Sequence, residues 1–345
     1  SLIKYYDFHS IRSSLGYLRF GIFSLGVFYF LEKRQDIIKW LFITFLICFL
    51  LLIFDGYYQY FNKVSFFTGI EVKGSRRISS LFGTELIMGS YLSRLFPIFL
   101  GITFYLYKEK KGILILLSII FVSIEVLIFL SGERSSFFFN TLAAIYIIIM
   151  IKDFKKIRLF SFIASIIIIF LISNIDNAAK KRVVDETINQ MGLKSEKKYI
   201  FSVVHEGHYM SAYKMFLDNK ILGIGVRNFR NFCNEDKYKI NNRSCTTHPH
   251  NTYVQLLSET GLIGFIFGIS VFIFFIIISL KHLLGVITKN KYLFNDFEIC
   301  LLSAILISLW PLVPTGNFLN NWVAIVYYFP VGFLFWSLNT RNINK

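Results

Sequence analysis

Nine apolar segments of roughly membrane-spanning length divide this chain and make up about half of it. An α-helix needs about 20 apolar residues to cross the hydrocarbon core, where its backbone hydrogen bonds must be satisfied internally. With 55% hydrophobic residues overall, the pattern predicts an all-α polytopic membrane protein with about nine transmembrane helices. The nine segments are 15–31, 37–54, 86–107, 112–130, 135–151, 157–174, 254–280, 294–310 and 318–338.

The connectors between these segments fall into two classes by charge. Connectors rich in Lys and Arg alternate with connectors that are not, and the alternation runs through all nine segments. Because basic loops are retained in the cytoplasm, we expect 55–85 and 175–253 on the opposite side of the membrane. The formal net charge of +16 then reflects loops at an anionic membrane surface, so no nucleic-acid partner is expected. The expected cytoplasmic stretches are 32–36, 108–111, 152–156, 281–293 and 339–345.

This topology predicts three regions along the chain. Six transmembrane helices occupy 1–174 with the short outer loop 55–85, a helical loop domain occupies 175–253, and three transmembrane helices occupy 254–345. Nine spans place residue 1 on the outer side, so we expect an odd number of further spans before it.

Charged residues inside the apolar segments are costly and mark candidate functional positions. Arg19, Arg94 and Glu125 lie within segments, each in the expected outer half. Arg134 begins the next segment on the same side, and Arg77 lies in the first outer loop. This asymmetry predicts a polar cavity that opens outward. The alternative is that Arg19 and Arg94 reach toward lipid headgroups, and that Glu125 pairs with one of them to hold helices together.

The cysteines fit the same orientation. Cys48 and Cys300 lie in apolar segments, where a thiol behaves as a small apolar group. Cys233 and Cys245 are twelve positions apart in the long outer loop. On an oxidising side of the membrane they can form a disulfide, and two unpaired thiols are the alternative.

The stretch "THPHNTYVQLLSETGLIG", residues 247–264, places polar chemistry at the start of an apolar segment. Thr247 is a suitable N-cap and Pro249 suits a first helical turn. His250 and Asn251 are then expected in that turn, beside backbone N–H groups that suit an anionic phosphate. The positive end of the helix dipole is expected to lower the pKa of His250 and keep the ring neutral.

Further residues of this stretch extend the pattern. Asn251, Gln255 and Glu259 recur every four positions and predict a polar stripe. Gly261 and Gly264 have the spacing that lets another helix approach closely. Two alternatives remain open: a capped helix at the membrane boundary without further function, and a zinc site. The candidate zinc ligands are His205, His208, His248 and His250, although "HEGH" does not have the HExxH spacing.

The chain resembles a known family at this point. "HN", nine further residues and "GLIG" resemble the His-containing signature of the O-antigen ligase and O-antigen polymerase superfamily. "RRISSLFGTELIMGSYL", "SGERSSFF" and "AYKMFLDNKILGIGVRNF" resemble further stretches of that family, so the similarity covers most of 70–280. Members of this family are membrane glycosyltransferases that use undecaprenyl-diphosphate-linked sugars. They have about twelve spans, which implies roughly three before residue 1.

The resemblance carries over to particular residues. His250 matches the essential histidine of the family, and Arg134 and Arg77 match its arginines. Where many members have a second arginine ahead of the "A…F" pattern, this chain has His208, so Arg227, Arg230 or a protonated His208 is expected to replace it. Arg94, Asn251 and Glu259 complete the candidate residues for binding diphosphate or sugar.

The resemblance also implies a reaction and its setting. An acceptor hydroxyl, deprotonated or held by His250, attacks the anomeric carbon of a glycan linked to undecaprenyl diphosphate, and Arg134 stabilises the leaving diphosphate. The setting is the outer, periplasmic face of a bacterial inner membrane, with no cofactor and no metal required. The acceptor is lipid A-core in a ligase and another lipid-linked glycan in a polymerase. The long basic loop favours the ligase. A transporter without chemistry is the alternative from another class.

Overall fold

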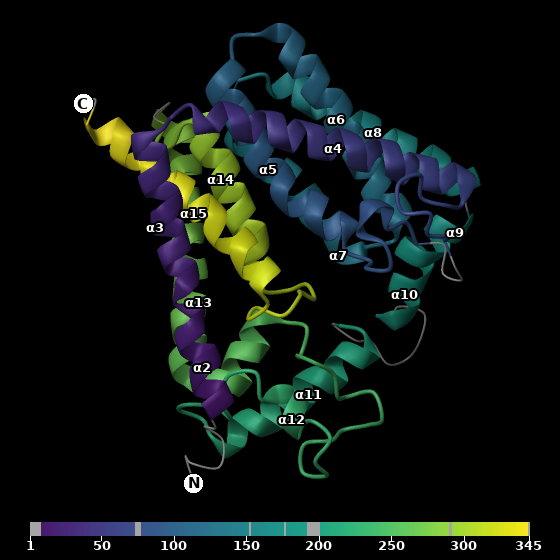
Figure 1. Cartoon of the computed structure of the whole chain (residues 1–345), viewed down its shortest axis with the longest axis vertical. Helices are drawn as coiled ribbons and strands as arrows, with labels where there is room; N and C mark the ends of the chain where they lie inside the picture. Colours follow the sequence, from purple (N-terminus) through teal and green to yellow (C-terminus); the bar gives the residue numbers. More distant parts are fainter. Residues whose placement is uncertain are drawn as a thin grey trace. The chain divides into compact units, whose positions relative to one another are not determined.

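The computed structural model describes residues 8–72, 77–151, 153–175, 177–191, 201–289 and 292–343 (Figure 1). Over these residues the chain is helical, and apart from one isolated bridge between Val64 and Glu71 no β-structure occurs in them. The predicted all-α fold class is therefore confirmed.

Each of the nine apolar segments contains a helix. These helices are α3 (Arg19–Lys33), α4 (Ile37–Asn62), α5 (Met88–Tyr107), α6 (Lys111–Ser131), α7 (Arg134–Met150), α8 (Lys155–Ile175), α13 (Thr252–Leu284), α14 (Asp296–Ser308) and α15 (Asn321–Ile343). Within the described ranges, six helical stretches are long and apolar enough to cross a membrane, and α7 is a shorter apolar helix. The polytopic class is confirmed, and the number nine stays a prediction. The six stretches are Ser10–Lys33, Ile37–Asn62, Gly112–Ser131, Lys155–Ile175, Thr252–Thr288 and Asn321–Arg341.

Short helices connect and flank the long ones. They are α2 (Phe8–Tyr17), η1 (Ser80–Phe82), α9 (Asn177–Lys180), η2 (Lys181–Asp185), α10 (Glu186–Gln190), α11 (Val203–Asp218), α12 (Phe229–Phe232) and η3 (Gly285–Lys289).

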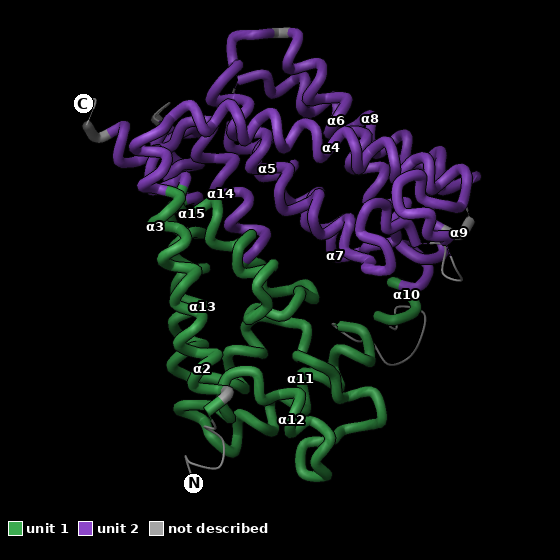
Figure 2. Tube along the Cα trace, in the orientation of Figure 1, with its two compact units in different colours: residues 1–27, 187–278, 309–332 green, residues 28–186, 279–308, 333–345 purple. Residues whose placement is uncertain are grey.

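By packing, the chain forms two compact units (Figure 2). Unit 1 comprises 1–27, 187–278 and 309–332, and unit 2 comprises 28–186, 279–308 and 333–345. The division predicted from the sequence, into 1–174, 175–253 and 254–345, describes the expected membrane topology and stays a prediction. Each unit is described by itself below.

Unit 2 is built around α14, a helix that is apolar on all sides. Its residues from Phe297 to Ser308 are all buried, and it packs against α5 and α7. A side chain at Gly101 of α5 would come within 3.0 Å of the Cβ atom of Cys300 on α14. The missing side chain therefore permits the close approach of these two helices.

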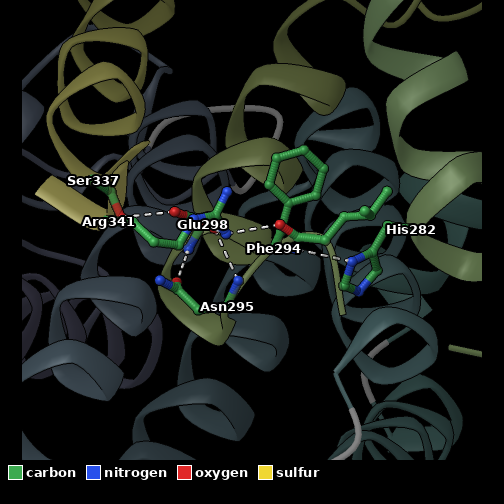
Figure 3. Close-up of polar contacts among 7 residues, drawn as sticks. His282, Phe294, Asn295, Glu298, Ser337 and Arg341 are labelled. Carbon is green, nitrogen blue, oxygen red and sulfur yellow. Dashed lines mark hydrogen bonds and ion pairs between the residues drawn. The ribbon is translucent and has the colours of Figure 1, made fainter. Parts of the chain in front are cut away.

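The start of α14 is fixed by a buried carboxylate (Figure 3). The Asn295 Oδ1 accepts the Glu298 N–H at 2.9 Å, and the Glu298 Oε2 accepts the Asn295 N–H at 2.9 Å, which is a reciprocal cap. Glu298 is fully buried and also pairs with Arg341 at 2.9 Å and accepts the Ser337 hydroxyl at 3.0 Å. These contacts join the last turns of α15 to the first turn of α14.

Unit 1 has its own apolar core in the predicted outer loop. A cluster of buried side chains from α11, α12 and the following turns packs against Val254 at the start of α13. The cluster comprises Ala212, Met215, Ile224, Phe229, Cys233 and Tyr238. Cys233 and Cys245 are joined as a disulfide, with their Cα atoms 5.0 Å apart. The link closes a loop on this core and leads into the stretch that carries His250.

Candidate functional site

His250 lies in unit 1, immediately before α13. Its backbone is left-handed, with φ of 57°, and its carbonyl accepts the Thr315 N–H at 2.8 Å. A residue other than glycine rarely adopts this conformation, and such positions occur often at functional sites. The expectation that His250 belongs to the first helical turn is wrong, because the helix begins at Thr252.

Asn251, rather than Thr247, caps this helix. The Asn251 Oδ1 accepts the N–H groups of Tyr253 and Val254 at 3.0 and 3.1 Å. The Asn251 side-chain amide donates to the Pro311 carbonyl at 2.7 Å. The expectation that these N–H groups are available to a phosphate is therefore wrong, since the cap already satisfies two of them. Thr247 instead contacts the Nδ1 of His248 at 2.9 Å.

Three other histidine rings gather around His250. The centroids of His248, His208 and His205 lie 4.1, 5.5 and 5.7 Å from that of His250. Because the Nε2 of His208 contacts the Arg243 carbonyl at 2.9 Å, this nitrogen carries the proton. The Nδ1 of His208 and the Nε2 of His248 are buried without a hydrogen-bond partner. Two ring nitrogens next to His250 are thus without partners, which suits a hydroxyl-bearing ligand.

The surroundings keep these rings uncharged. Burial lowers the pKa of His250 to about 4, the nearby His208 lowers it further, and the Thr315 backbone acts in the opposite direction. Burial, followed by His250, lowers the pKa of His248 to about 3. The pKa of His208 is also lowered by burial. His250 is neutral as expected, but the largest cause is burial and not the helix dipole.

The histidines do not form a metal site in the described part of the chain. There, no group of three or more His, Cys, Asp or Glu side chains is arranged to hold a metal ion. The independence from metal ions implied by the resemblance stays a prediction.

Glu259 holds the turn that carries Arg227. It is buried, and its carboxylate accepts the Phe229 N–H at 3.1 Å and the Gln255 amide at 3.1 Å. Gln255 also donates to the Asn317 Oδ1 at 2.8 Å. Arg227 itself has a left-handed backbone, with φ of 65°, and donates to the Leu319 carbonyl at 2.7 Å. Glu259 therefore positions backbone, and its described contacts do not include His250.

Arg230 follows this turn on α12, and its side chain is exposed. It lies within electrostatic range of both Glu259 and His248. Arg227 and Arg230 therefore lie in the same unit as His208. They are the two arginines that the sequence offers in place of the second arginine of the family.

Gly261 interrupts α13. With φ of 65° and ψ of −159° it adopts a conformation that is essentially restricted to glycine. The freed backbone groups pair with the 220–225 segment: Ile224 N–H donates to the Ser258 carbonyl at 2.9 Å, and Leu262 N–H donates to the Lys220 carbonyl at 2.8 Å. The expectation of a helix packing at this glycine is wrong, because its neighbour is this loop.

Unit 2 contains a separate cluster of arginines. The Arg77 Nε donates to the Ser131 carbonyl at 3.3 Å. The pKa of Arg77 is lowered overall. Burial is the largest cause, the nearby Glu133 acts in the opposite direction, and Arg182 lowers the pKa further. Arg134 lies within electrostatic range of Arg77, Arg182 and Glu186. Three guanidinium groups near two carboxylates leave positive charge for an anion such as a diphosphate.

Sequence reasoning did not single out Arg182. It lies in the short π-helix η2, and its side chain forms an ion pair with Glu186. An added side chain at Gly132 would meet the Arg182 Cγ at 2.9 Å, so Arg182 packs over the "SGER" turn. The signal was weak, because the polar stretch around it contains several Lys and Arg residues.

The glutamate of the "SGER" turn, Glu133, has a structural role. The Glu133 carboxylate accepts the N–H groups of Gly89 and Ser90, at 2.7 and 3.0 Å, and thereby caps α5. The turn thus joins the starts of α5 and α7, and it presents Arg134 beside Arg77.

The charges within the apolar segments are held by local contacts. Arg94 is buried, donates to the Ser90 hydroxyl at 2.7 Å and lies 4.9 Å from the Phe139 ring centre. Glu125 accepts hydrogen bonds from Asn140 and from Thr141, so its partners are polar side chains of α7 and not an arginine. In unit 1, Arg19 donates to the Asn321 Oδ1 at 2.6 Å.

Together these features define a multi-pass helical membrane protein with a buried, uncharged histidine cluster in one unit and an arginine cluster in the other. Residues 115–269 match the O-antigen ligase family. This match agrees with the resemblance to the O-antigen ligase and O-antigen polymerase superfamily that the motifs predicted. The matched region extends from α6 into α13 and contains Arg134 and His250. Comparison with curated proteins gave no match.

Proposed function

We propose that this protein transfers a glycan from undecaprenyl diphosphate to an acceptor hydroxyl, most specifically to lipid A-core, on the periplasmic face of a bacterial inner membrane. The match of residues 115–269 to the O-antigen ligase family supports glycosyl transfer of the O-antigen ligase and polymerase type. The observation that supports the assignment of residues is the neutral, partly buried His250, which lies beside two ring nitrogens that have no hydrogen-bond partner among the described residues.

His250 acts on the acceptor. A neutral imidazole accepts the proton of the hydroxyl as its oxygen attacks the anomeric carbon. The Nδ1 of His208 can accept a hydrogen bond from a sugar hydroxyl, and the Nε2 of His248 can donate or accept one according to its tautomer, which would orient the acceptor.

The arginines act on the donor. As the new bond forms, the bond between the anomeric carbon and the diphosphate oxygen breaks, and the electron pair leaves with undecaprenyl diphosphate. We propose that Arg134 and Arg77, which match the family motifs, stabilise the negative charge that develops on the leaving diphosphate. We add Arg182 because it lies in the same cluster. Arg227 and Arg230 are assigned to the second diphosphate contact, in place of the arginine that His208 replaces.

The test supplies lipid-diphosphate-linked glycan to the purified protein and measures release of undecaprenyl diphosphate. His250→Gln is expected to reduce turnover by about 10²–10⁴, which is the usual contribution of a general base. Arg134→Gln is expected to reduce turnover strongly, whereas Arg34→Gln, which removes an exposed ion pair with Asp36, leaves it unchanged. Full turnover by a folded His250→Gln protein would remove the proposed base.

The acceptor is decided in the same assay. Adding lipid A-core is expected to give a glycan attached to lipid A-core. Product chains that lengthen only when more lipid-linked glycan is added would show a polymerase instead. A chelator is expected to leave turnover unchanged, since no metal is assigned to the reaction.

A further inference from the structure

Unit 2 contains a hollow that the proposed reaction does not use. It lies between α5, α6, α7 and α8, and it encloses about 620 Å³, counting its open mouth. Its walls are almost entirely apolar, with a few polar atoms that are described below.

One face of α7 forms a wall along the length of the hollow. The lining residues are Asn140, Ala143, Ala144, Ile147 and Ile148, which recur at the three- and four-residue spacing of a single helix face. Eight residues of helix correspond to about 12 Å, so the hollow is long enough for a stretch of hydrocarbon chain. The two alanines leave open the space that larger side chains would fill.

The walls of the hollow that α5 and α6 form are also apolar. Helix α5 contributes Phe96 and Leu100, and α6 contributes Leu114, Leu117 and Phe121. Such surfaces gain free energy when they contact hydrocarbon instead of water. A small, hydrated anion has no such partners along these walls.

A partly buried cation lies at one end of the hollow. The Arg158 Nη2 donates to the Ile151 carbonyl at 2.6 Å, which places this guanidinium near the end of α7. The Arg158 Nε and Nη1 atoms are buried and have no hydrogen-bond partner among the described residues. The nearby carboxylates of Asp153 and Asp296 are both ion-paired with Lys108, at 2.6 and 2.9 Å. Arg158 therefore retains donors for an anionic group.

We propose that this hollow binds one acyl chain of an anionic phospholipid, with the lipid phosphate on Arg158. The apolar, elongated walls match the chain, and the unpaired guanidinium nitrogens match the phosphate. Lys155 and Lys156, exposed on the first turn of α8, add positive charge on the side that the charge pattern assigns to the cytoplasm. The site is distinct from the histidine cluster and does not depend on the proposed glycosyl transfer.

The test uses the full protein in phosphatidylcholine vesicles that contain phosphatidylglycerol with a photoreactive acyl chain. Crosslinks are expected in the peptides of α5 to α8. Arg158→Gln is expected to reduce this labelling by about tenfold, corresponding to loss of a charge-assisted hydrogen bond. Ala144→Phe, which fills the hollow, is expected to reduce it similarly. Lys39→Gln, an exposed charge on α4 in the same unit, is the matched control and is expected to change labelling little.

A second measurement uses only the wild-type protein, so it does not depend on the folding of a variant. Unlabelled phosphatidylglycerol is expected to compete with the probe, and phosphatidylcholine is expected to compete poorly. Equal competition by the two lipids would show that Arg158 does not select the headgroup. Competition by an isoprenyl phosphate and not by phosphatidylglycerol would show that the occupant is wrong, and labelling outside α5 to α8 would show that the site is wrong.

Discussion

At the scale of single residues, burial determines the chemistry of His250. Its pKa is lowered to about 4, so the ring loses its capacity to accept a proton only when the pH falls to that region. We expect the acid limb of the kcat/KM profile near pH 4, well below the value of about 6.5 for a free histidine. A pH series of the carrier-release assay measures this limb. A limb centred near pH 6.5 would mean that another group, or an exposed His250, controls the rate.

The neighbouring His208 contributes to the same effect. When the pH is low enough to protonate His208, its charge disfavours a second charge on His250, so removing His208 raises the pKa of His250. His208→Gln is therefore expected to move the acid limb to higher pH, whereas a purely structural role would change the rate without moving the limb. Lys214→Gln on the same helix α11 is the control, and its profile is expected to match that of the wild type.

The sequence singled out the histidines that the structure brings together, but it did not predict how they are held. The amino-acid sequence shows four histidines in the loop 175–253 and a resemblance to a family signature at His250. The left-handed backbone of His250 could not be predicted, because Thr247 and Pro249 are equally consistent with an earlier helix start. The alternative cap at Asn251 is completed by Pro311, a residue sixty positions away, and local patterns carry no such information.

At the scale of elements, the break in α13 depends on Gly261. An added Cβ would lie 2.3 Å from the Ile221 oxygen, and the backbone conformation is itself disallowed for other residues. Gly261→Ala is expected to destabilise the protein by about 3 kcal/mol or more, combining backbone strain with a steric clash. Thermal unfolding in detergent measures the loss.

Gly21→Ala is the matched control for that substitution. Gly21 lies in α3 in the same unit, and no atom lies within 4 Å of its added Cβ. Alanine in a helix is favoured over glycine by roughly 0.5–1 kcal/mol, so this variant is expected to be unchanged or slightly more stable. An equal loss in both variants would mean that the geometry at Gly261 is not the cause.

The start of α14 offers a second test at this scale. Glu298→Ala removes a reciprocal cap and leaves Arg341 and the Ser337 hydroxyl without their buried acceptor. The expected loss of stability is about 2–3 kcal/mol, measured by thermal unfolding. Because Arg341 is partly exposed, Arg341→Gln is expected to cost less. The reverse order would contradict a role for Glu298 as the shared acceptor.

Hydrophobic periodicity predicted the helices well and their interruptions poorly. Every apolar segment contains a helix, since a run of apolar residues in a membrane has few alternatives. The kink at Gly261 escaped prediction because the pairing that satisfies it comes from the 220–225 segment. The "GLIG" spacing is compatible both with close helix packing and with this break.

At the scale of the whole molecule, the composition of the two units could not be read from the sequence. Unit 1 combines 1–27, 187–278 and 309–332, three stretches separated by long intervals. Such groupings depend on contacts between distant segments, which propensity and periodicity do not report. The orientation of the chain in the membrane, in contrast, is predicted from the distribution of Lys and Arg and can be tested directly.

The charge pattern predicts that the 175–253 loop is periplasmic and that 108–111 is cytoplasmic. Single cysteines introduced as Asp236→Cys and Lys110→Cys test this, because Asp236 is an exposed residue of that loop and Lys110 is an exposed residue between α5 and α6. A membrane-impermeant maleimide applied to cells with a permeabilised outer membrane is expected to label Asp236→Cys. Lys110→Cys is expected to react only after the inner membrane is opened. The opposite result would place His250 on the cytoplasmic side, away from the periplasmic acceptor, and the ligase assignment would then fail even for a protein that retains glycosyl transfer.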